Sequence, residues 1–259
     1  MIHSRTLERP SSQTEENTDT PAVRAIDAVK TYGKGDSAVR ALDGVSVDLY
    51  RGGFTAIMGP SGSGKSTLLN CLAGLETLTE GRVLVGDTDL AHLNDRQLTE
   101  LRRNRIGFIF QSFNLIPTLT AEQNITLPAR FGGSVIEQDW FDQVVATVGL
   151  KNRLRHRPSE LSGGQQQRVA VARALAARPD IIIADEPTGN LDSDSGAEIL
   201  AFMRNAVAEL GQTIVMVTHD PISASYADRA LFLADGRMIE DLHMPTYQSI
   251  LDQLRAFGE

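Results

Sequence analysis

The sequence is poor in cysteine, in basic charge and in long apolar runs, and each shortage excludes a class of protein. Cys71 is the only cysteine in 259 residues, so no internal disulfide can form, and a reducing cytoplasm suits the chain. Lys and Arg number 25 against 33 Asp and Glu, and this net charge of −8 argues against the broad basic surface that nucleic-acid binding needs. No run of about 18 apolar residues occurs, so the sequence predicts no membrane-spanning helix.

The start of the chain carries no targeting signal that we can identify. Residues 1–21 are polar, rich in Ser, Thr and Glu, and lack the apolar core of a signal peptide. Such a composition buries too little apolar surface to fold by itself. The sequence therefore predicts a disordered tail over residues 1–21, followed by one large domain over residues 22–259.

Glycine, by contrast, is plentiful, and three of the 22 glycines lie in GPSGSGKS at residues 59–66, which fits G-x-x-x-x-G-K-[ST]. The stretch lies between the apolar run Phe54–Met58 and the helix-forming segment Thr67–Ala73. Glycines let backbone N–H groups converge on phosphate oxygens, and a helix start adds more N–H groups. A Gly/Ser turn would explain the glycines but not the strand–loop–helix setting. We expect a nucleoside-triphosphate site in which Lys65 reaches the β and γ phosphates and Ser66 ligates Mg²⁺. Its residues are Gly59, Pro60, Ser61, Gly62, Ser63, Gly64, Lys65, Ser66 and Thr67.

Short apolar segments alternate with helical ones, which is typical of an α/β fold with a largely parallel sheet. Residues 95–160 contain mainly helices and predict a helical subdomain inserted into the core. Three helix starts carry a capping-box pattern, at Asn94…Gln97, Thr120…Gln123 and Ser134…Glu137, and the last of these helices should stop at Gly149. The predicted strands are Val23–Val29, Val45–Leu49, Phe54–Met58, Arg82–Val85, Ile106–Phe110, Ile181–Ala184, Thr213–Val217 and Ala230–Ala234.

Two carboxylates, Asp185 and Glu186, end the apolar strand at 181–184. Ligands of open α/β sheets bind at the carboxyl ends of strands, so Asp185 can hold the Mg²⁺ shell and Glu186 can polarise the attacking water. A solvated strand end is the alternative interpretation. The phosphate loop elsewhere in the chain favours the functional one.

A second anion-binding pattern, Leu161-Ser162-Gly163-Gly164-Gln165, opens a helix that runs on through Ala176. With this motif the sequence resembles the ATP-binding cassette (ABC) ATPases, from about Val23 to Asp241. The resemblance implies a phosphate-loop NTPase core with an antiparallel β subdomain and the inserted helical subdomain, and it implies ATP and Mg²⁺ as ligands. It also implies a head-to-tail homodimer, in which each ATP lies between the Gly59–Ser66 loop of one subunit and Ser162, Gly163, Gly164 and Gln165 of the other.

The same resemblance implies further roles. Tyr32 matches the aromatic that stacks on adenine, Gln111 the loop glutamine that reaches the metal, and His219 the switch histidine near the γ phosphate. Asp192 matches the aspartate of a loop that crosses to the partner subunit. This loop reads Gly-Asn-Leu-Asp where many relatives have Ser-Ala-Leu-Asp. Without the resemblance, Tyr32 and His219 would be interpreted as packing residues.

Two longer segments, IGFIFQSFNLIPTLTAEQNITLP at residues 106–128 and HRPSELSGGQQQRVAVARAL at residues 156–175, resemble the ATPases of macrolide exporters, lipoprotein-release complexes and the division-linked pair. This resemblance implies an ATPase subunit held peripherally at the cytoplasmic face of the membrane by a permease. Phe113, Leu115, Ile116 and Leu119 would form the apolar groove that receives the permease, unless some of them belong to the core. The alternatives are a division or cell-wall regulator that moves no cargo and an importer subunit. DNA-repair members need a longer insert and translation factors usually carry two cassettes, and the cargo is not readable from this chain.

Overall fold

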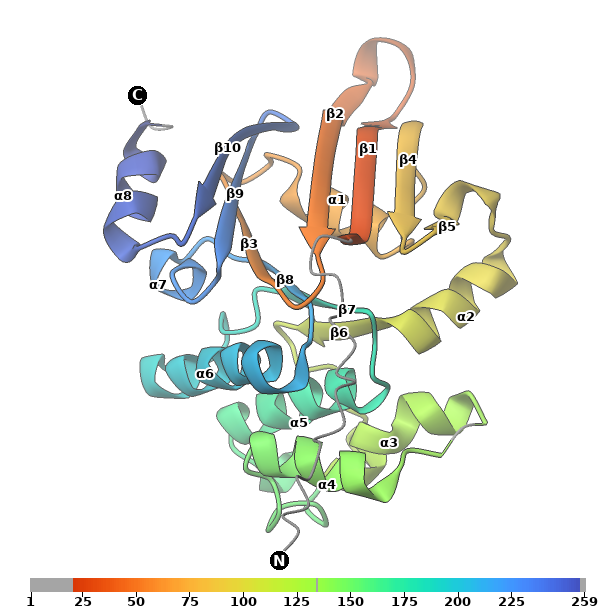
Figure 1. The fold of residues 1–259 in the computed structure, drawn as a ribbon, viewed down its shortest axis with the longest axis vertical. Coiled ribbons are helices and arrows are strands. Elements are labelled where there is room, and N and C mark those ends of the chain that lie inside the picture. Colours follow the sequence, from red (N-terminus) through yellow and green to blue (C-terminus); the bar gives the residue numbers. More distant parts are fainter. Residues whose placement is uncertain (1–20, 134, 257–259) are drawn as a thin grey trace, which may run out of the picture.

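A computed structural model describes residues 21–133 and 135–256 of the chain. Two sheets and a set of helices make up these residues (Figure 1). The expected tail at residues 1–21 lies outside them except for Pro21, which opens the first strand. Within these residues, no helix is both long and apolar enough to cross a membrane.

The smaller sheet is antiparallel, with the strand order β2-β1-β4-β5. β1 (Pro21–Tyr32) and β2 (Val39–Tyr50) form a long hairpin, and β4 (Glu80–Val85) and β5 (Thr88–Asp89) complete the sheet. Alternate residues of β2 are buried, as expected for a sheet with one face on the core. The antiparallel β subdomain is confirmed, and only the two-residue β5 was not predicted.

The larger sheet has the order β10-β9-β3-β8-β7-β6 and is parallel except for β10. Its central strands are continuous buried apolar runs, typical of a sheet covered on both faces. β10 escaped prediction because its residues alternate between exposed and half-buried at the sheet edge. The strands are β3 (Phe54–Met58), β6 (Ile106–Phe110), β7 (Ile181–Asp185), β8 (Ile214–Val217), β9 (Arg229–Ala234) and β10 (Arg237–His243).

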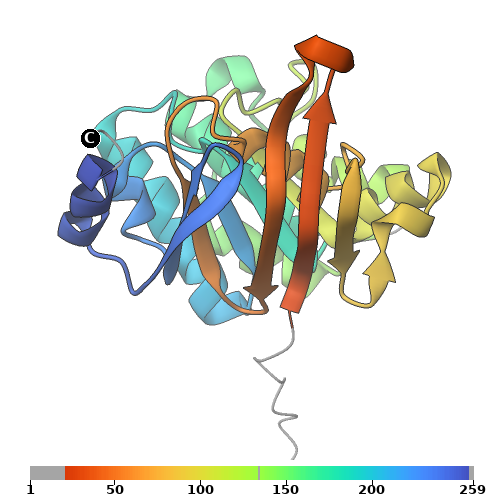
Figure 2. The same ribbon diagram turned by 90° about the horizontal axis from the view of Figure 1, so that it is seen from above.

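Helices cover both faces of this sheet. α1 (Lys65–Leu72) packs between the two sheets, where it contacts β1, β2, β4, β7 and β8. Figure 1 shows α3, α4, α5 and α6 gathered at the opposite end of the molecule, and Figure 2 shows the β1–β2 hairpin on the other side of the central sheet. The remaining helices are α2 (Asp95–Arg105), α3 (Ala121–Phe131), α4 (Gln138–Thr147), α5 (Gly163–Ala176), α6 (Ser193–Leu210), α7 (Pro221–Ala224) and α8 (Tyr247–Ala256), with short 3₁₀ turns at Gly35–Ser37, Leu90–His92 and Pro158–Glu160.

The pleat of the central sheet divides the core in two. Phe54, Ala56 and Met58 point to the side of α4, α5 and α6, while Ile57 points to α1 and the antiparallel sheet. A strand buried on both faces fixes its register strongly, because a one-residue slip would exchange the two core faces. The strand ends are therefore held in place, and the loops that follow them are positioned by the core.

Two of the three predicted helix starts are confirmed. Asn94 and Gln97 form a reciprocal capping box on α2, and Thr120 and Gln123 form one on α3. The start at Ser134 is wrong: Ser134 itself lies outside the described residues, and α4 begins only at Gln138. Residues 135–137 are not helical, and the carboxylate of Glu137 pairs with Arg178 at 3.0 Å instead of capping a helix.

α4 ends as predicted. Its apolar face is buried, and Gly149 follows in the left-handed conformation at φ 67°.

Candidate active site

The strand order brings four predicted site segments to one edge of the central sheet. β3, β8, β7 and β6 are neighbours and all parallel, so their carboxyl ends meet. The glycine loop follows β3, His219 follows β8, Asp185 ends β7 and Gln111 follows β6. The pairing of Ile57 with Val217, and of Asp185 with both Val217 and Phe110, places these ends level with each other.

The glycine loop has the backbone shape that its sequence predicts. Gly59 has φ 140° and Gly64 has φ 102°, both in the region that favours glycine. A Cβ on Gly59 would lie 2.0 Å from the Leu233 carbonyl oxygen, and one on Gly64 would lie 2.3 Å from that of Ala41. Gly64 is the N-cap of α1 and offers no side-chain cap, so the first N–H groups of α1 remain available to an anion.

Lys65 is folded back over its own loop. Its Nζ donates hydrogen bonds to the carbonyl oxygens of Gly59 and Pro60, both at 2.8 Å. Burial lowers the pKa of the Lys65 ammonium, while Glu186 and Asp185 partly oppose that shift. A phosphate bound in the loop could therefore replace these two carbonyl oxygens as the hydrogen-bond acceptors of the Lys65 ammonium.

The two carboxylates differ in their surroundings. Burial and the neighbouring Glu186 raise the pKa of the Asp185 carboxyl, and Lys65 lowers it in part. Glu186 has a left-handed backbone (φ 46°), and its N–H donates to the Val217 carbonyl at 3.0 Å. This strained turn aims its Oε1 at Nδ1 of His219, 2.8 Å away. Glu186 and His219, predicted separately, therefore form a hydrogen-bonded pair.

The predicted metal ligands Ser66, Gln111 and Asp185 supply oxygen donors only. Among the described residues no three His, Cys, Asp or Glu side chains gather into a metal-binding group. Mg²⁺ suits such a site, because it is bound through one or two carboxylates together with substrate phosphates and waters. The donor set fits Mg²⁺ better than a softer metal.

Gln111 has a partner that the sequence analysis did not assign. Its Nε2 donates to Oδ1 of Asn190 at 3.1 Å, and Nδ2 of Asn190 donates back to the Gln111 main-chain oxygen at 3.0 Å. The only signal in the sequence was the departure at this position from the loop that many relatives carry.

Tyr32 is 40% exposed at the end of β1. Its hydroxyl donates to the carboxylate of Glu76, whose pKa this bond lowers, and the Lys30 ammonium lies 5.0 Å from the ring centroid. Lys30 also pairs with Glu76 at 3.5 Å. Burial, followed by the bond to Glu76, raises the pKa of Tyr32. Glu76 and Lys30 were missed because nothing in their local sequence marks them.

The second anion-binding motif opens α5 through a capping box. The Ser162 Oγ accepts from the Gln165 N–H at 3.3 Å, and Oε1 of Gln165 accepts from the Ser162 N–H at 3.1 Å. Neither residue bonds to the Gly59–Ser66 loop within the described chain. A Cβ on Gly164 would lie 3.0 Å from the Ser195 Oγ, which explains the small residue there. Asp192 caps α6 through Ser195, and these hydrogen bonds lower its pKa.

The expected apolar groove at Phe113–Leu119 stays a prediction: Ile116 is 37% exposed, whereas Phe113 and Leu115 are half-buried. Leu115 packs against the core, and the carbonyl oxygens of Phe113 and Asn114 accept hydrogen bonds from Arg173. Phe113 and Asn114 also have left-handed backbones. A hollow of about 390 Å³ lies beside this segment, and Asn114 is the one residue of Phe113–Leu119 that lines it.

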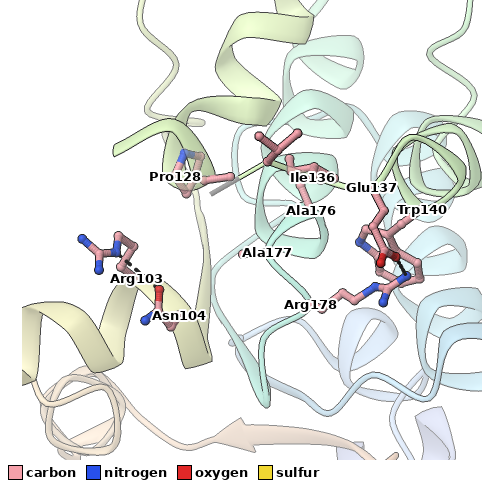
Figure 3. A pocket seen from close by; sticks show the side chains of 11 residues that line it. Arg103, Asn104, Pro128, Ile136, Glu137, Trp140, Ala176, Ala177 and Arg178 are labelled. Atoms are coloured by element: carbon pink, nitrogen blue, oxygen red, sulfur yellow. Dashed lines mark hydrogen bonds and ion pairs between the residues drawn. The ribbon is translucent and has the colours of Figure 1, made fainter. Parts of the chain in front are cut away.

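A second hollow of about 310 Å³ adjoins the first, because Arg103, Pro128 and Ala177 line both. Figure 3 shows Arg103 and Asn104 on one side of it, and Glu137, Trp140 and Arg178 on the other. The Arg178 guanidinium lies 4.6 Å from the Trp140 ring centroid. We call the two hollows together the arginine groove, because Arg102, Arg103, Arg173 and Arg178 line it against one acidic residue, Glu137.

A glycine loop between a parallel strand and a helix, with a lysine and two strand-end carboxylates at one edge, defines a phosphate-loop nucleoside triphosphatase. Comparison with known proteins narrows this class. The family model described as ABC transporter matches residues 42–189. The chain therefore belongs to the ABC transporter family. It is an ATP-binding and ATP-hydrolysing domain of that family.

Individual relatives agree with this assignment. The chain is 46% identical over 223 residues to the macrolide export ATP-binding/permease protein MacB of Brucella melitensis, covering 85% of this chain and 34% of the relative. It is 46% identical over 215 residues to an ABC transporter ATP-binding protein of Thermotoga maritima, covering 82% and 92%. The chain thus spans about a third of the length of the MacB relatives.

A solved structure shares the fold. The ATP-binding cassette MJ0796 of Methanocaldococcus jannaschii, in a dimeric post-hydrolysis state bound to ADP and phosphate, superposes with a TM-score of 0.76. It is 41% identical, and the match covers 86% of this chain and 99% of that one. The α/β class and the phosphate-loop core of ABC type are confirmed.

Proposed function

We propose that this chain works as a head-to-tail homodimer with Mg²⁺ and ATP and drives a membrane permease of the exporter or mechanotransmission type from the cytoplasmic face. The observation that carries the proposal is the meeting of Lys65, Asp185, Glu186 and His219 at adjacent strand ends, while Ser162–Gln165 open a separate helix. One chain therefore offers a complete phosphate site and a second anion site that does not close on it. The dimeric cassette similar to this chain supports the pairing of the two sites across subunits.

Each residue of the site has a defined task in this proposal. Lys65 exchanges the carbonyl oxygens of Gly59 and Pro60 for phosphate oxygens. Glu186 orients the attacking water, and His219 holds the Glu186 carboxylate from the other side. Ser66, Gln111 and Asp185 would hold Mg²⁺, which neutralises phosphate charge when bound. Tyr32 offers its ring to adenine.

The arginine groove is the surface that we assign to the permease. It combines apolar Phe108, Phe110 and Pro128 with four arginines in a chain of net charge −8. An acidic, amphipathic cytoplasmic segment of the membrane protein complements such a surface. The relatives named macrolide export ATP-binding/permease protein carry both functions in one chain, which supports a permease partner and favours the exporter type over the importer alternative.

The experiment uses Glu186→Gln, which keeps the size of the side chain but removes its charge. We expect ATP and Mg²⁺ to shift this variant from monomer to dimer in light scattering, with ATP turnover reduced by roughly 10²-fold or more. Adding Ser162→Arg at the second anion site should abolish the dimer and leave the monomer folded. A Glu186→Gln variant that binds ATP and stays monomeric at high protein concentration would contradict the head-to-tail arrangement.

A further inference from the structure

We propose that Asn190 is a positioning residue that sets which end of the Gln111 side-chain amide faces the metal. The inference rests on the proposed function, because it takes Gln111 as a ligand in the ATP site. An alanine at this position could make neither of the two hydrogen bonds that join Asn190 to Gln111.

One group in this contact has a fixed hydrogen-bonding polarity. The main-chain oxygen of Gln111 can only accept, so it must receive the Nδ2 group of Asn190, which lies 3.0 Å away. The orientation of the Asn190 amide is thereby determined, and its Oδ1 points to the Gln111 side chain. This oxygen can only accept as well, so it takes Nε2 of Gln111 at 3.1 Å. The amide oxygen of Gln111 is then left for a cation.

A side-chain amide alone has no such preference. Its oxygen and nitrogen are similar in size, and rotation by 180° exchanges them at little steric cost. Mg²⁺ requires the oxygen. A glutamine that is free to rotate would spend part of its time presenting N–H groups to the metal, and Asn190 removes that state.

Gly189 makes room for this arrangement. A Cβ at residue 189 would lie 2.8 Å from Nε2 of Gln111, so any larger residue would push the glutamine away. The φ of Gly189 is not in the left-handed region. The glycine is therefore needed for the space that it leaves and not for an unusual backbone conformation. Its N–H donates to the carbonyl of Glu186 at 3.0 Å, which fixes the loop to the carboxylate end of β7.

The same loop continues to the second anion site. A Cβ on Gly163 would lie 3.6 Å from Cδ2 of Leu191 and 3.8 Å from Cζ of Phe113. Leu191 and Phe113, which follow Asn190 and Gln111 closely in sequence, therefore lie near the start of α5.

The experiment measures nucleotide binding, so it does not depend on turnover. Two proteins carry Glu186→Gln, and one of them also carries Asn190→Ala. The ATP affinity of each is measured by calorimetry with Mg²⁺ and again with EDTA. Of the two hydrogen bonds that Asn190→Ala removes, the one from Nε2 of Gln111 orients the metal-facing amide, and one such bond changes an equilibrium by about 2- to 12-fold. We expect Asn190→Ala to weaken ATP binding in the presence of Mg²⁺ within that range, by about 2- to 12-fold, and to leave binding in EDTA unchanged.

A double-mutant cycle separates positioning from general damage. In a Gln111→Ala background, Asn190→Ala should have no further effect on the Mg²⁺-dependent affinity. Asn205→Ala, an exposed asparagine on α6, is the matched control and should change neither affinity.

Three outcomes overturn the inference: an unchanged Mg²⁺-dependent affinity in Asn190→Ala, an equal loss with EDTA, or an additive loss in the Gln111→Ala background. If the Asn190 parent itself fails to bind ATP, the proposed function fails instead, so the two failures are distinguishable.

Discussion

The hydroxyl of Tyr32 donates to the carboxylate of Glu76, and the Lys30 ammonium lies over the same ring. Two residues, Glu76 and Lys30, thus hold the half-exposed side chain of Tyr32 in one orientation. If adenine stacks on Tyr32, this orientation is prepared before ATP arrives. Ordering the ring in advance lowers the entropy cost of binding.

Replacing Glu76 with alanine should raise the KM for ATP by about 2- to 12-fold, the range for one lost hydrogen bond, and leave kcat unchanged. Glu76→Gln keeps an acceptor for the Tyr32 hydroxyl and should restore most of the affinity. Binding of inorganic tripolyphosphate, which has no base, serves as the control and should not respond. A matching loss with tripolyphosphate would show that Glu76 acts on the phosphate loop and not on the ring.

The charged Asp185 carboxylate should lower the stability of the folded protein at neutral pH. Burial raises the pKa of its carboxyl above the unfolded value, so the neutral form favours the folded state at low pH, and this contribution is lost as pH rises through the folded pKa. We therefore expect Asp185→Asn to raise the Tm of the nucleotide-free protein at pH 8, with a smaller gain towards pH 4, while Mg²⁺-dependent ATPase activity is lost. A Tm gain that does not change with pH would rule out the titration of Asp185 as its cause.

Two glycines of the phosphate loop should respond differently to alanine. Gly62 has φ 82° but open space around a Cβ, so Gly62→Ala should lower the free energy of unfolding by about 1–2 kcal/mol, the cost of a left-handed residue. Gly59→Ala places its Cβ 2.0 Å from the Leu233 carbonyl oxygen and should cost clearly more. Urea unfolding measures both. Equal losses would mean that the loop moves freely away from β9.

Arg103 should contribute to permease docking by charge. Arg103→Glu reverses a guanidinium shared by both hollows of the arginine groove and should reduce recovery of the permease from detergent by several-fold. Arg96→Glu, on the same helix but outside the groove, is the charge-matched control. Added salt should weaken the parent complex towards the level of the variant. If both variants lose recovery equally, net charge and not the groove is responsible.

Much of the site could be predicted because its chemistry is local. Lys65, Asp185, His219 and Gln111 each follow an apolar strand within a short motif, and parallel strands bring their ends together without further information. The same locality explains the correct capping boxes on α2 and α3, where cap and partner are three residues apart.

The rest depends on contacts between distant segments. Glu76 meets Tyr32 across 44 residues, and Asn190 meets Gln111 across 79. No periodicity marks such pairs. The start of α4 was predicted wrongly for a related reason: Glu137 suits a capping box, but the distant Arg178 takes its carboxylate. In the segment predicted to form a groove, Leu115 packs in part against the core while Ile116 is 37% exposed, a difference that the sequence pattern does not reveal.

The single tryptophan of the chain lies in the wall of the arginine groove, with a guanidinium over its ring and only 8% of its surface exposed. No residue of the Gly59–Ser66 loop lines that groove. Indole emission depends on nearby charge and water, so the protein carries a built-in optical label at one end of the molecule. Its fluorescence should respond when a segment enters the groove and displaces Arg178, and any change on adding nucleotide alone would be direct spectroscopic evidence of communication between the two ends.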